Sequence, residues 1–488
     1  MSDDLILVLD AGTTSTRAML LGADGRMHGV AQQELTQHYP APGWVEHDAA
    51  EIWDKTLACA RAVIAKAGGT DVVAAIGITN QRETVVAWDK ATGLPLHRAL
   101  VWQDRRTADA CAALKQQGHE ATVQAATGLL LDPYFSATKM RWLVDNSAAV
   151  ADAARAGRLA LGTVEDWLVF KLSGGAHLTD ASNASRTLLL PLAGMNWDEG
   201  LCDLFGVPRA SLGEVVDNAG RFAATDPDLL GRAIPITGLA GDQQSATIGQ
   251  GCLSPGQTKA TYGTGAFVLA NMGQTVPRSA NRLLGTVLCQ LGGERSYALE
   301  GSVFVAGSLI KWLRDSLGVI TSAAQTAELA ASVPDSGGVT IVPALAGLGA
   351  PHWRPEARAA VTGMTFATTR AHLARAALEA MAMQTLELAE AFAADGAAWT
   401  ALRIDGGMSA NDWMAQDLAD VLQIPVERPA FVETTALGAA MLAAVGAELH
   451  GSLDQAAAAM RGAVEQFAPS TTDTAARRSA WDRALTAT

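Results

Sequence analysis

Several familiar motifs for phosphate chemistry and hydrolysis are missing from this sequence of 488 residues. It contains no Gly-x-x-x-x-Gly-Lys-Ser/Thr and neither His-Arg-Asp nor Asp-Phe-Gly, which excludes P-loop NTPases and protein kinases. It also lacks His-Glu-x-x-His and Gly-x-Ser-x-Gly, the signatures of common zinc proteases and serine hydrolases. Any chemistry on a phosphate group must therefore rest on other residues.

Positive charge is scarce, with 36 Lys and Arg residues against 50 Asp and Glu residues and a formal net charge of −14. The only tight basic pairs are Arg105-Arg106 and Arg477-Arg478, so the sequence predicts no nucleic-acid partner. A smaller anion such as ATP can still be held locally by backbone amides, a metal ion and a few placed side chains.

Cysteine and long apolar runs are also limited. The five cysteines are scattered and form no Cys-x-x-Cys, which indicates reduced, mostly buried thiols rather than disulfides or a zinc site. Uncharged stretches near 260–277 and 336–353 are interrupted by Gly and Pro, so no membrane insertion is expected. The acidic start, Met1-Ser2-Asp3-Asp4, has no signal-peptide pattern, and we expect a cytoplasmic protein.

The remaining composition is that of a globular chain, with 49% apolar and 18% charged residues. Its length allows about three domains or two large ones. Strand-like runs alternate with helical patterns, which predicts an α/β fold. The strand-like runs are Val72–Thr79, Thr340–Pro343 and Leu402–Asp405, and the helical patterns span 371–392, 413–422, 434–446 and 455–465.

Two similar hairpin patterns lie roughly 250 residues apart. In the first, the apolar run Leu5–Leu9 leads through Asp10–Arg17 into Ala18–Leu21. In the second, residues 258–262 lead through Gly263-Thr264-Gly265 into a further apolar run. The repetition predicts a duplicated chain with two domains, residues 1–250 and 251–488.

The tip of the first hairpin is rich in groups that bind phosphate. Asp10 suits a hydrated Mg²⁺ ion, Arg17 offers positive charge, and amides and hydroxyls come from Thr13, Thr14 and Ser15. The alternative is an ordinary polar hairpin tip, and the motif alone does not choose between the two.

Further carboxylates and glycines stand at the ends of predicted strands. Asp242 follows a glycine-rich apolar stretch, where it can act as a base while Gln243 binds a substrate; the alternative is a helix N-cap. The segment Asp405–Asn411 contains two adjacent glycines that suit a nucleotide, or form a plain turn between strand and helix.

A fourth group suits a compound with adjacent hydroxyls. Arg82 and Glu83 present donors and acceptors together after an apolar strand, although a solvated ion pair is the alternative. Trp102, Tyr134 and Phe267 lie beside loop signals, where each alone is more often a core residue than the wall of a ligand site.

Taken together, these segments resemble the FGGY family of carbohydrate kinases from about residue 5 to about residue 445. The resemblance rests on long strings and on the two general signatures of the family, Tyr134–Asn146 and Ala359–Glu379. The strings are Tyr39–Asp48, Gly77–Thr84, Asp132–Lys139, Asn183–Thr187, Ala240–Gln244, Thr261–Gly265 and Gly347–Pro351.

The resemblance implies two actin-like (ribonuclease-H-like) ATPase domains flanking a deep cleft. It implies transfer of the ATP γ-phosphate to the terminal hydroxyl of glycerol with Mg²⁺, giving sn-glycerol 3-phosphate and ADP, the first step of glycerol catabolism. The alternatives are a kinase of another short polyol or ketose, such as erythritol or xylulose, and an actin-like ATPase switch that is no kinase.

The resemblance also assigns roles residue by residue. Asp242 is the expected catalytic base, and Asp10 and Asp242 are the expected metal ligands. The expected substrate-binding residues are Arg82, Glu83, Trp102, Tyr134, Asp242, Gln243 and Phe267. The expected phosphate- and nucleotide-binding residues are Thr13, Thr14, Ser15, Arg17, Thr264, Gly307, Lys311, Gly407 and Asn411.

Four departures from the family pattern stand out. Ala11 and Lys311 replace glutamines that lie near the nucleotide in relatives. The stretch Pro227–Ile236 lacks the loop that binds fructose 1,6-bisphosphate in some members, and the tail Pro469–Thr488 does not resemble their segment for a sugar-transport regulator. We therefore expect neither form of feedback, and the resemblance suggests a homodimer or homotetramer.

Overall fold

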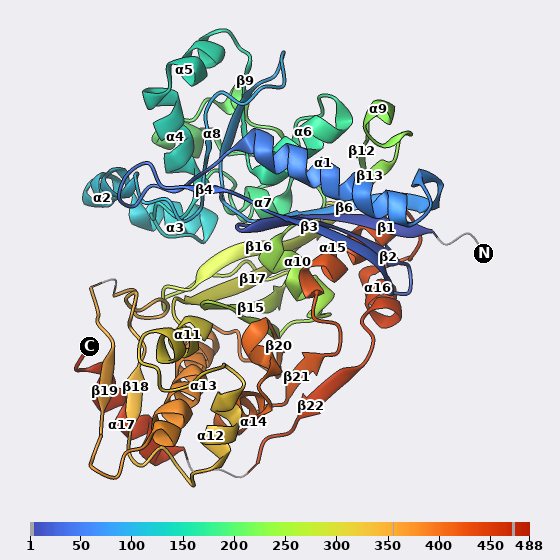
Figure 1. Ribbon diagram of the computed structural model, residues 1–488. Coiled ribbons are helices and arrows are strands. Elements are labelled where there is room, and N and C mark those ends of the chain that lie inside the picture. Colours follow the sequence, from blue (N-terminus) through green and yellow to red (C-terminus); the bar gives the residue numbers. More distant parts are fainter. Residues whose placement is uncertain (1–3, 355, 471–473) are drawn as a thin grey trace.

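The computed structural model describes residues 4–354, 356–470 and 474–488 (Figure 1). The first half contains β1 (Leu5–Ala11), β2 (Ser15–Gly22), β3 (Met27–Glu34), β4 (Gln37–His38), β5 (Glu46–His47), α1 (Ala49–Lys66), β6 (Val73–Asn80), β7 (Val86–Asp89), β8 (Ala99–Leu100), α2 (Ala108–Gln116), α3 (Glu120–Thr127), α4 (Ser136–Asn146), α5 (Ala148–Arg155), β9 (Leu159–Gly162), α6 (Val164–Ser173), β10 (Leu178–Asp180), α7 (Ala181–Ala184), α8 (Glu199–Phe205), β11 (Glu214–Val216), β12 (Ala219–Ala224), α9 (Pro227–Leu230), β13 (Pro235–Gly241) and α10 (Asp242–Gly249).

The second half contains β14 (Gln257–Tyr262), β15 (Ala266–Gly273), β16 (Leu284–Leu291), β17 (Glu294–Val303), α11 (Gly307–Asp315), α12 (Gln325–Ala331), β18 (Thr340–Val342), β19 (Ala360–Thr362), α13 (Arg370–Ala394), β20 (Ala401–Asp405), α14 (Asp412–Leu422), β21 (Val426–Pro429), α15 (Thr434–Gly446), α16 (Leu453–Met460), β22 (Val464–Phe467) and α17 (Ala475–Leu485). Short 3₁₀ helices span Thr70–Val72, Arg209–Ser211 and Gly407–Ala410.

Two mixed sheets organise the chain. The first has the strand order β12-β13-β6-β1-β2-β3, and the second β16-β17-β15-β14-β20-β21-β22. In both, a hairpin strand pairs antiparallel with its partner and parallel with a later strand: β1 with β2 and β6, and β14 with β15 and β20. The expected two-domain α/β fold is confirmed, and both predicted hairpins are present.

The strands at the centres of the sheets explain the apolar runs in the sequence. All seven residues of β1 are buried, because β1 lies between β2 and β6 and is covered on its faces by helices. Such strands appear in the sequence as continuous apolar runs rather than as alternating patterns. The runs end where the hairpins turn, so Asp10 and Thr261, each the second-last residue of its strand, lie at corresponding places in their sheets.

Most helical patterns are found where the sequence predicts them, as α13, α14 and α15. The pattern over 455–465 is partly wrong, because α16 ends at Met460 and β22 begins at Val464. Gly462 between them has a φ of 68°, which breaks the helix, and β22 pairs antiparallel with β21 at the sheet edge. Backbone pairing at that edge thus overrides the local helical preference.

Helix α15 belongs to the last part of the chain but packs on the first sheet. It contacts β13, β6 and β1 on one side and α10 on the other (Figure 1, where the red α15 and α16 lie beside β1 and β2). Gly438 of α15 touches α10 so closely that a Cβ atom would overlap the carbonyl oxygen of Ser245. Gly77 makes equivalent room in β6, since its Cβ would lie 2.5 Å from the carbonyl oxygen of Ala439. Small residues therefore let one helix fit tightly between a sheet and a second helix.

The described residues contain no helix that is long and apolar enough to span a bilayer. All five cysteines are buried and unpaired, as predicted.

Replacing Gly438 by alanine should push α15 and α10 apart. We expect Gly438→Ala to lower the free energy of unfolding by about 2 kcal/mol or more, the usual cost of overpacking a dense interior. Urea unfolding followed by circular dichroism measures this change. The matched control is Gly200→Ala in α8, where the glycine is exposed and alanine favours the helix. Equal stabilities of Gly438→Ala and the parent protein would contradict the tight contact.

Candidate active site

The tip of the first hairpin is held by charged contacts. Asp10, the second-last residue of β1, has a buried carboxylate, and Nη2 of Arg17 lies 2.6 Å from its Oδ2. Nη1 of Arg17 lies 2.6 Å from Oε2 of Glu433, which immediately precedes α15. Burial raises the pKa of Asp10, and Arg17 opposes this effect. Arg17 thus bridges two carboxylates, one of which, Glu433, the sequence did not single out.

Gln81 fastens this tip to the segment that follows β6. Its Nε2 donates to the carbonyl oxygen of Gly12 over 3.0 Å, and its Oε1 accepts from the hydroxyl of Thr84 over 2.8 Å. The indole Nε1 of Trp102 donates to Oγ1 of Thr13 over 2.9 Å. The predicted phosphate tip and the predicted polyol residues therefore form one connected unit.

The two remaining hydroxyl residues at the tip differ in exposure. Thr14 is exposed, and its backbone oxygen accepts from the amide of Leu35 over 2.9 Å. Ser15 is half-buried, and its hydroxyl accepts from Nε2 of Gln32 over 3.1 Å. The Thr14 side chain is thus the more open of the two toward a ligand.

Arg82 and Glu83 belong to a buried network of two arginines and two glutamates, not to a solvated ion pair. Nη1 of Arg82 lies 2.6 Å from Oε2 of Glu300, and Nε of Arg186 lies 2.6 Å from Oε1 of Glu83. Nη2 of Arg186 also lies 3.0 Å from Oε1 of Glu300. The four side chains are at most 2% exposed. Glu300 from the second sheet therefore joins groups that come from the first half of the chain.

The charges of this network stabilise one another unequally. Burial alone raises the pKa of Glu300, but Arg186 and Arg82 outweigh burial and hold that pKa at about 2. Burial raises the pKa of Glu83, against the opposing effect of Arg82 and Arg186. Because the Glu300 pKa is depressed, its stabilising contribution is complete above pH 4.5 and is lost as the pH falls toward 2.

Asp242 is the most open carboxylate beside this network. It is the first residue of α10, directly after β13, and its side chain is 31% exposed. Oδ1 lies 3.4 Å from Nε of Arg82 and accepts from the amide of Gln243 over 2.7 Å. The N-cap residue of α10 is Gly241, so the alternative of a capping aspartate is wrong. Burial raises the pKa of Asp242, and Arg82 and Lys259 counteract part of this shift.

Two of the three aromatic residues predicted to bind the substrate come together. The rings of Trp102 and Tyr134 are T-shaped with centroids 5.6 Å apart, and Nη2 of Arg82 donates to the Tyr134 hydroxyl over 3.4 Å. Phe267 lies on β15, paired with Thr261 and Ser302 of the neighbouring strands, and is half-buried. All three rings are partly accessible rather than closed into the core.

The tip of the second hairpin supports the start of α11. The carbonyl oxygen of Thr264 accepts from the amides of Ala306 and Ser308, and the amide of Gly307 donates to the carbonyl oxygen of Gly263. A Cβ atom at Gly307 would lie 2.5 Å from that oxygen, so only glycine fits there. Lys311 is exposed one turn further along α11.

The predicted nucleotide segment borders a pocket of about 720 Å³. Gly407 is exposed with open space beside it, whereas Asn411 caps α14 through Oδ1 and donates to Oγ1 of Thr326 over 3.0 Å. The segment forms a 3₁₀ turn before α14 rather than opening the helix directly. The pocket is lined by Gly406, Gly407, Ser409, Ala410, Arg428, Pro429, Ala430, Val432, Glu433, Ala463, Val464 and Glu465.

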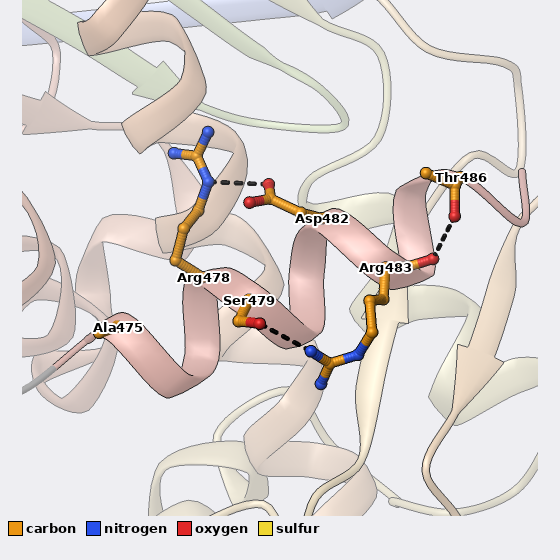
Figure 2. A pocket seen from close by; sticks show the side chains of 6 residues that line it. All are labelled: Ala475, Arg478, Ser479, Asp482, Arg483 and Thr486. Carbon is orange, nitrogen blue, oxygen red and sulfur yellow. Dashed lines mark hydrogen bonds and ion pairs between the residues drawn. The ribbon is translucent and has the colours of Figure 1, made fainter.

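Glu433 links this pocket to the first hairpin, since it also binds Arg17. A second hollow, of about 580 Å³, lies on α17 and has a different character (Figure 2). There Arg478 binds Asp482 and Arg483 donates to Ser479, so the basic side chains are paired along one helix surface. None of the predicted site residues lines that hollow.

Comparison with known proteins supports one family. The model for the N-terminal domain of the FGGY carbohydrate kinases matches residues 5–249, and that for the C-terminal domain matches residues 258–447. Because these matches cover most of the chain, the chain belongs to the FGGY family of carbohydrate kinases.

Its relatives include several glycerol kinases. The glycerol kinase of Rhodospirillum rubrum is 55% identical over 92% of this chain and 91% of the relative. That of Dechloromonas aromatica is 52% identical over 99% of this chain and 97% of the relative. A crystal structure of Plasmodium falciparum glycerol kinase with ADP has a TM-score of 0.94 and 35% identity, covering 99% of this chain and 98% of the other.

The fold is also shared with a kinase of another acceptor. The xylulose kinase of Rhodospirillum rubrum has a TM-score of 0.85 and 26% identity over 99% of this chain and 97% of the other. The fold alone therefore does not determine the acceptor, which must be argued from the site.

Removing the shared carboxylate should weaken the whole network. We expect Glu300→Gln to lower the free energy of unfolding by about 3 to 5 kcal/mol, because two buried guanidiniums lose their common counter-charge. Urea unfolding at neutral pH tests this value. Asp152→Asn, which removes an exposed ion pair with Arg155, is the control and should leave stability unchanged. A Glu300→Gln protein as stable as the parent would contradict the role of the network.

Proposed function

We propose that the chain transfers the γ-phosphate of ATP to a terminal hydroxyl of glycerol, giving sn-glycerol 3-phosphate and ADP. The observation that carries this proposal is the buried Arg82–Glu83 set beside the accessible carboxylate of Asp242. The glycerol kinases that match this chain with 52–56% identity over nearly its full length support the same acceptor.

Recognition of the acceptor follows from the inventory of donors and acceptors. The Arg82 guanidinium donates hydrogen bonds to hydroxyl oxygens, while Glu83, held by Arg186, accepts hydrogen bonds from hydroxyl groups. Because both side chains are buried, an analogue without matching hydroxyls leaves the donor and acceptor positions that face it unfilled and is rejected. In this proposal the hydroxyl of Tyr134 hydrogen-bonds glycerol, and Trp102 and Phe267 contact its carbon chain.

Asp242 is the general base in this proposal. Its carboxylate takes the proton from the attacking hydroxyl, and Arg82 orients it from 3.4 Å. Phosphoryl transfer needs little covalent help beyond positioning and charge stabilisation, so one base and oriented donors suffice. Closure of the two domains around the acceptor would exclude water, the competing nucleophile.

Mg²⁺ fits the carboxylates present. The described residues hold no cluster of three or more His, Cys, Asp or Glu side chains that would cage a metal. Mg²⁺ is commonly held by one or two carboxylates together with substrate phosphates, and Asp10 and Asp242 supply such a pair. The bound ion would supply positive charge to the phosphates.

The remaining predicted residues serve ATP in this proposal. Phosphate oxygens are bound by Thr13, Thr14, Ser15, Arg17 and Thr264. The nucleoside lies against Gly307, Lys311, Gly407 and Asn411; the open flank of Gly407 and the pocket beside it support this placement. The ADP in the Plasmodium falciparum structure supports a nucleotide ligand.

We further propose two domains, residues 1–250 and 251–488, and a cytoplasmic homodimer or homotetramer, on the family resemblance. We propose no feedback through Pro227–Ile236 or the tail Pro469–Thr488, the two regions that depart from the family pattern. Arg232, within Pro227–Ile236, donates hydrogen bonds to backbone oxygens, including that of Thr70 over 3.1 Å. In the tail, residues 471–473 lie outside the described residues, and α17 follows them.

A panel of acceptors tests the proposed reaction. Purified protein with Mg-ATP should release ADP fastest with glycerol, more slowly with dihydroxyacetone, erythritol or xylulose, and barely without acceptor. Preference for erythritol or xylulose would assign the chain to a different acceptor. Strong turnover without any acceptor would instead indicate an ATPase switch.

Removing the proposed base separates chemistry from binding. We expect Asp242→Asn to lower kcat by at least ~10²-fold, the usual contribution of a general base, with glycerol affinity largely retained. Steady-state kinetics and calorimetric titration with glycerol measure the two quantities. Asp54→Asn, an exposed substitution in α1, is the control and should behave like the parent protein. A near-normal kcat for Asp242→Asn would remove Asp242 from this role.

A further inference from the structure

A fully buried lysine lies beside the proposed base and is not among the predicted site residues. Lys259 is in the middle of β14, between Leu269 of β15 and Arg403 of β20, and is 0% exposed. Lysines are rarely buried completely unless their charge is paired. We therefore expect the role of Lys259 to follow from the group that pairs with its ammonium.

The ammonium of Lys259 reaches across to α10. Its Nζ donates to Oε1 of Gln243 over 2.6 Å, and the neighbouring charged groups include Asp405, Asp242, Arg82 and Glu300. Burial lowers the pKa of Lys259, and Asp405 and Asp242 oppose that effect. The contact links the second sheet to the residue that follows the proposed base.

The geometry indicates that the main role of Lys259 is not to neutralise Asp405. Oδ2 of Asp405 already accepts from Oγ1 of Thr434 over 2.6 Å and from Nε2 of Gln250 over 3.0 Å. The hydrogen bond of the Lys259 ammonium goes instead to Gln243, a half-buried residue in the first turn of α10.

The lysine settles which way the Gln243 amide points. An ammonium has only donors, so its partner atom must be the carbonyl oxygen of the amide, and the amide NH₂ group then faces away from Lys259. The Gln243 backbone is fixed as well, because its carbonyl oxygen accepts from Oγ1 of Thr247 over 2.7 Å. Gln243 thus has a single preset orientation before any acceptor arrives.

We propose that Lys259 is a positioning residue that holds the Gln243 amide with its NH₂ group toward the polyol, and so sets the affinity for the acceptor. The proposal rests on the proposed function, in which Gln243 binds glycerol. Lys259 touches neither the acceptor nor the phosphate in this arrangement. Its effect through Gln243 therefore belongs in the KM for the acceptor. Because Lys259 also opposes the rise in the pKa of Asp242, kcat is compared at a pH high enough to keep that carboxylate ionised in every variant.

A double-mutant cycle tests the proposal. We expect Lys259→Met and Gln243→Met each to raise the KM for glycerol about tenfold, the value of one hydrogen bond of about 1.4 kcal/mol, with kcat within about threefold of the parent. The double variant should raise KM no further, because both changes remove the same interaction. The KM for ATP should stay constant, as should both parameters in Lys90→Met, which removes a remote lysine contact with the carbonyl oxygen of Ala210.

Several results would overturn the proposal. They are an unchanged KM in Lys259→Met, a fall in kcat without a change in KM, and multiplication of the two single effects in the double variant. If the acceptor panel shows a preference for another acceptor, the glycerol assignment fails. The double-mutant cycle is then measured as changes in the KM for that other acceptor. Turnover that needs no acceptor would overturn both proposals.

A second pair of variants decides the matter if Lys259→Met does not fold. Gln243→Glu keeps an oxygen for the ammonium but loses the NH₂ donors, whereas Gln243→Met loses both. We expect both variants to raise KM alike, with only Gln243→Met losing thermal stability, because it leaves a buried ammonium unpaired. Equal stabilities of Gln243→Glu and Gln243→Met would contradict the contact.

Discussion

The carboxylate of Glu300 is the constraint on which the arrangement of the site depends. It comes from β17 in the second sheet, yet it binds Arg82 and Arg186, which both come from the first half of the chain. Two guanidiniums could not share a buried space without such a counter-charge. Arg82 in turn contacts Asp242 and Tyr134, so the acceptor residues and the proposed base take their positions from one ion network.

A second set of contacts ties the phosphate side to the same frame. Arg17 connects Asp10 of the first hairpin to Glu433, and Lys259 connects β14 to α10. In each case a cation from one half of the chain lies against groups from the other half. Both sheets thus supply donors and acceptors to the proposed reaction. The contacts between charged groups help to fix the two sheets relative to each other.

Local patterns predicted the parts of this site that lie at strand ends. Asp10, Asp242 and the Arg82–Glu83 pair follow apolar runs, and such positions can be recognised along the chain. Glu300 and Lys259 lie inside strands, and Glu433 lies before a helix. The partners of Glu300 and Glu433 are more than 100 residues away along the chain. A lone acid within the apolar run Tyr297–Gly301 was the available signal for Glu300. The hydrogen bond from Asn411 to Thr326 and the strand at Val464 likewise depend on neighbours that no local pattern names.

The packing of α15 has a consequence for how the chain is made. The first sheet is complete once residue 241 has been synthesised, but the helix that covers β1, β6 and β13 ends at Gly446. During synthesis at about 5–20 residues per second, that apolar face waits at least about ten seconds for its cover. The apolar face of the nascent first half is therefore open to aggregation until α15 emerges and packs on it.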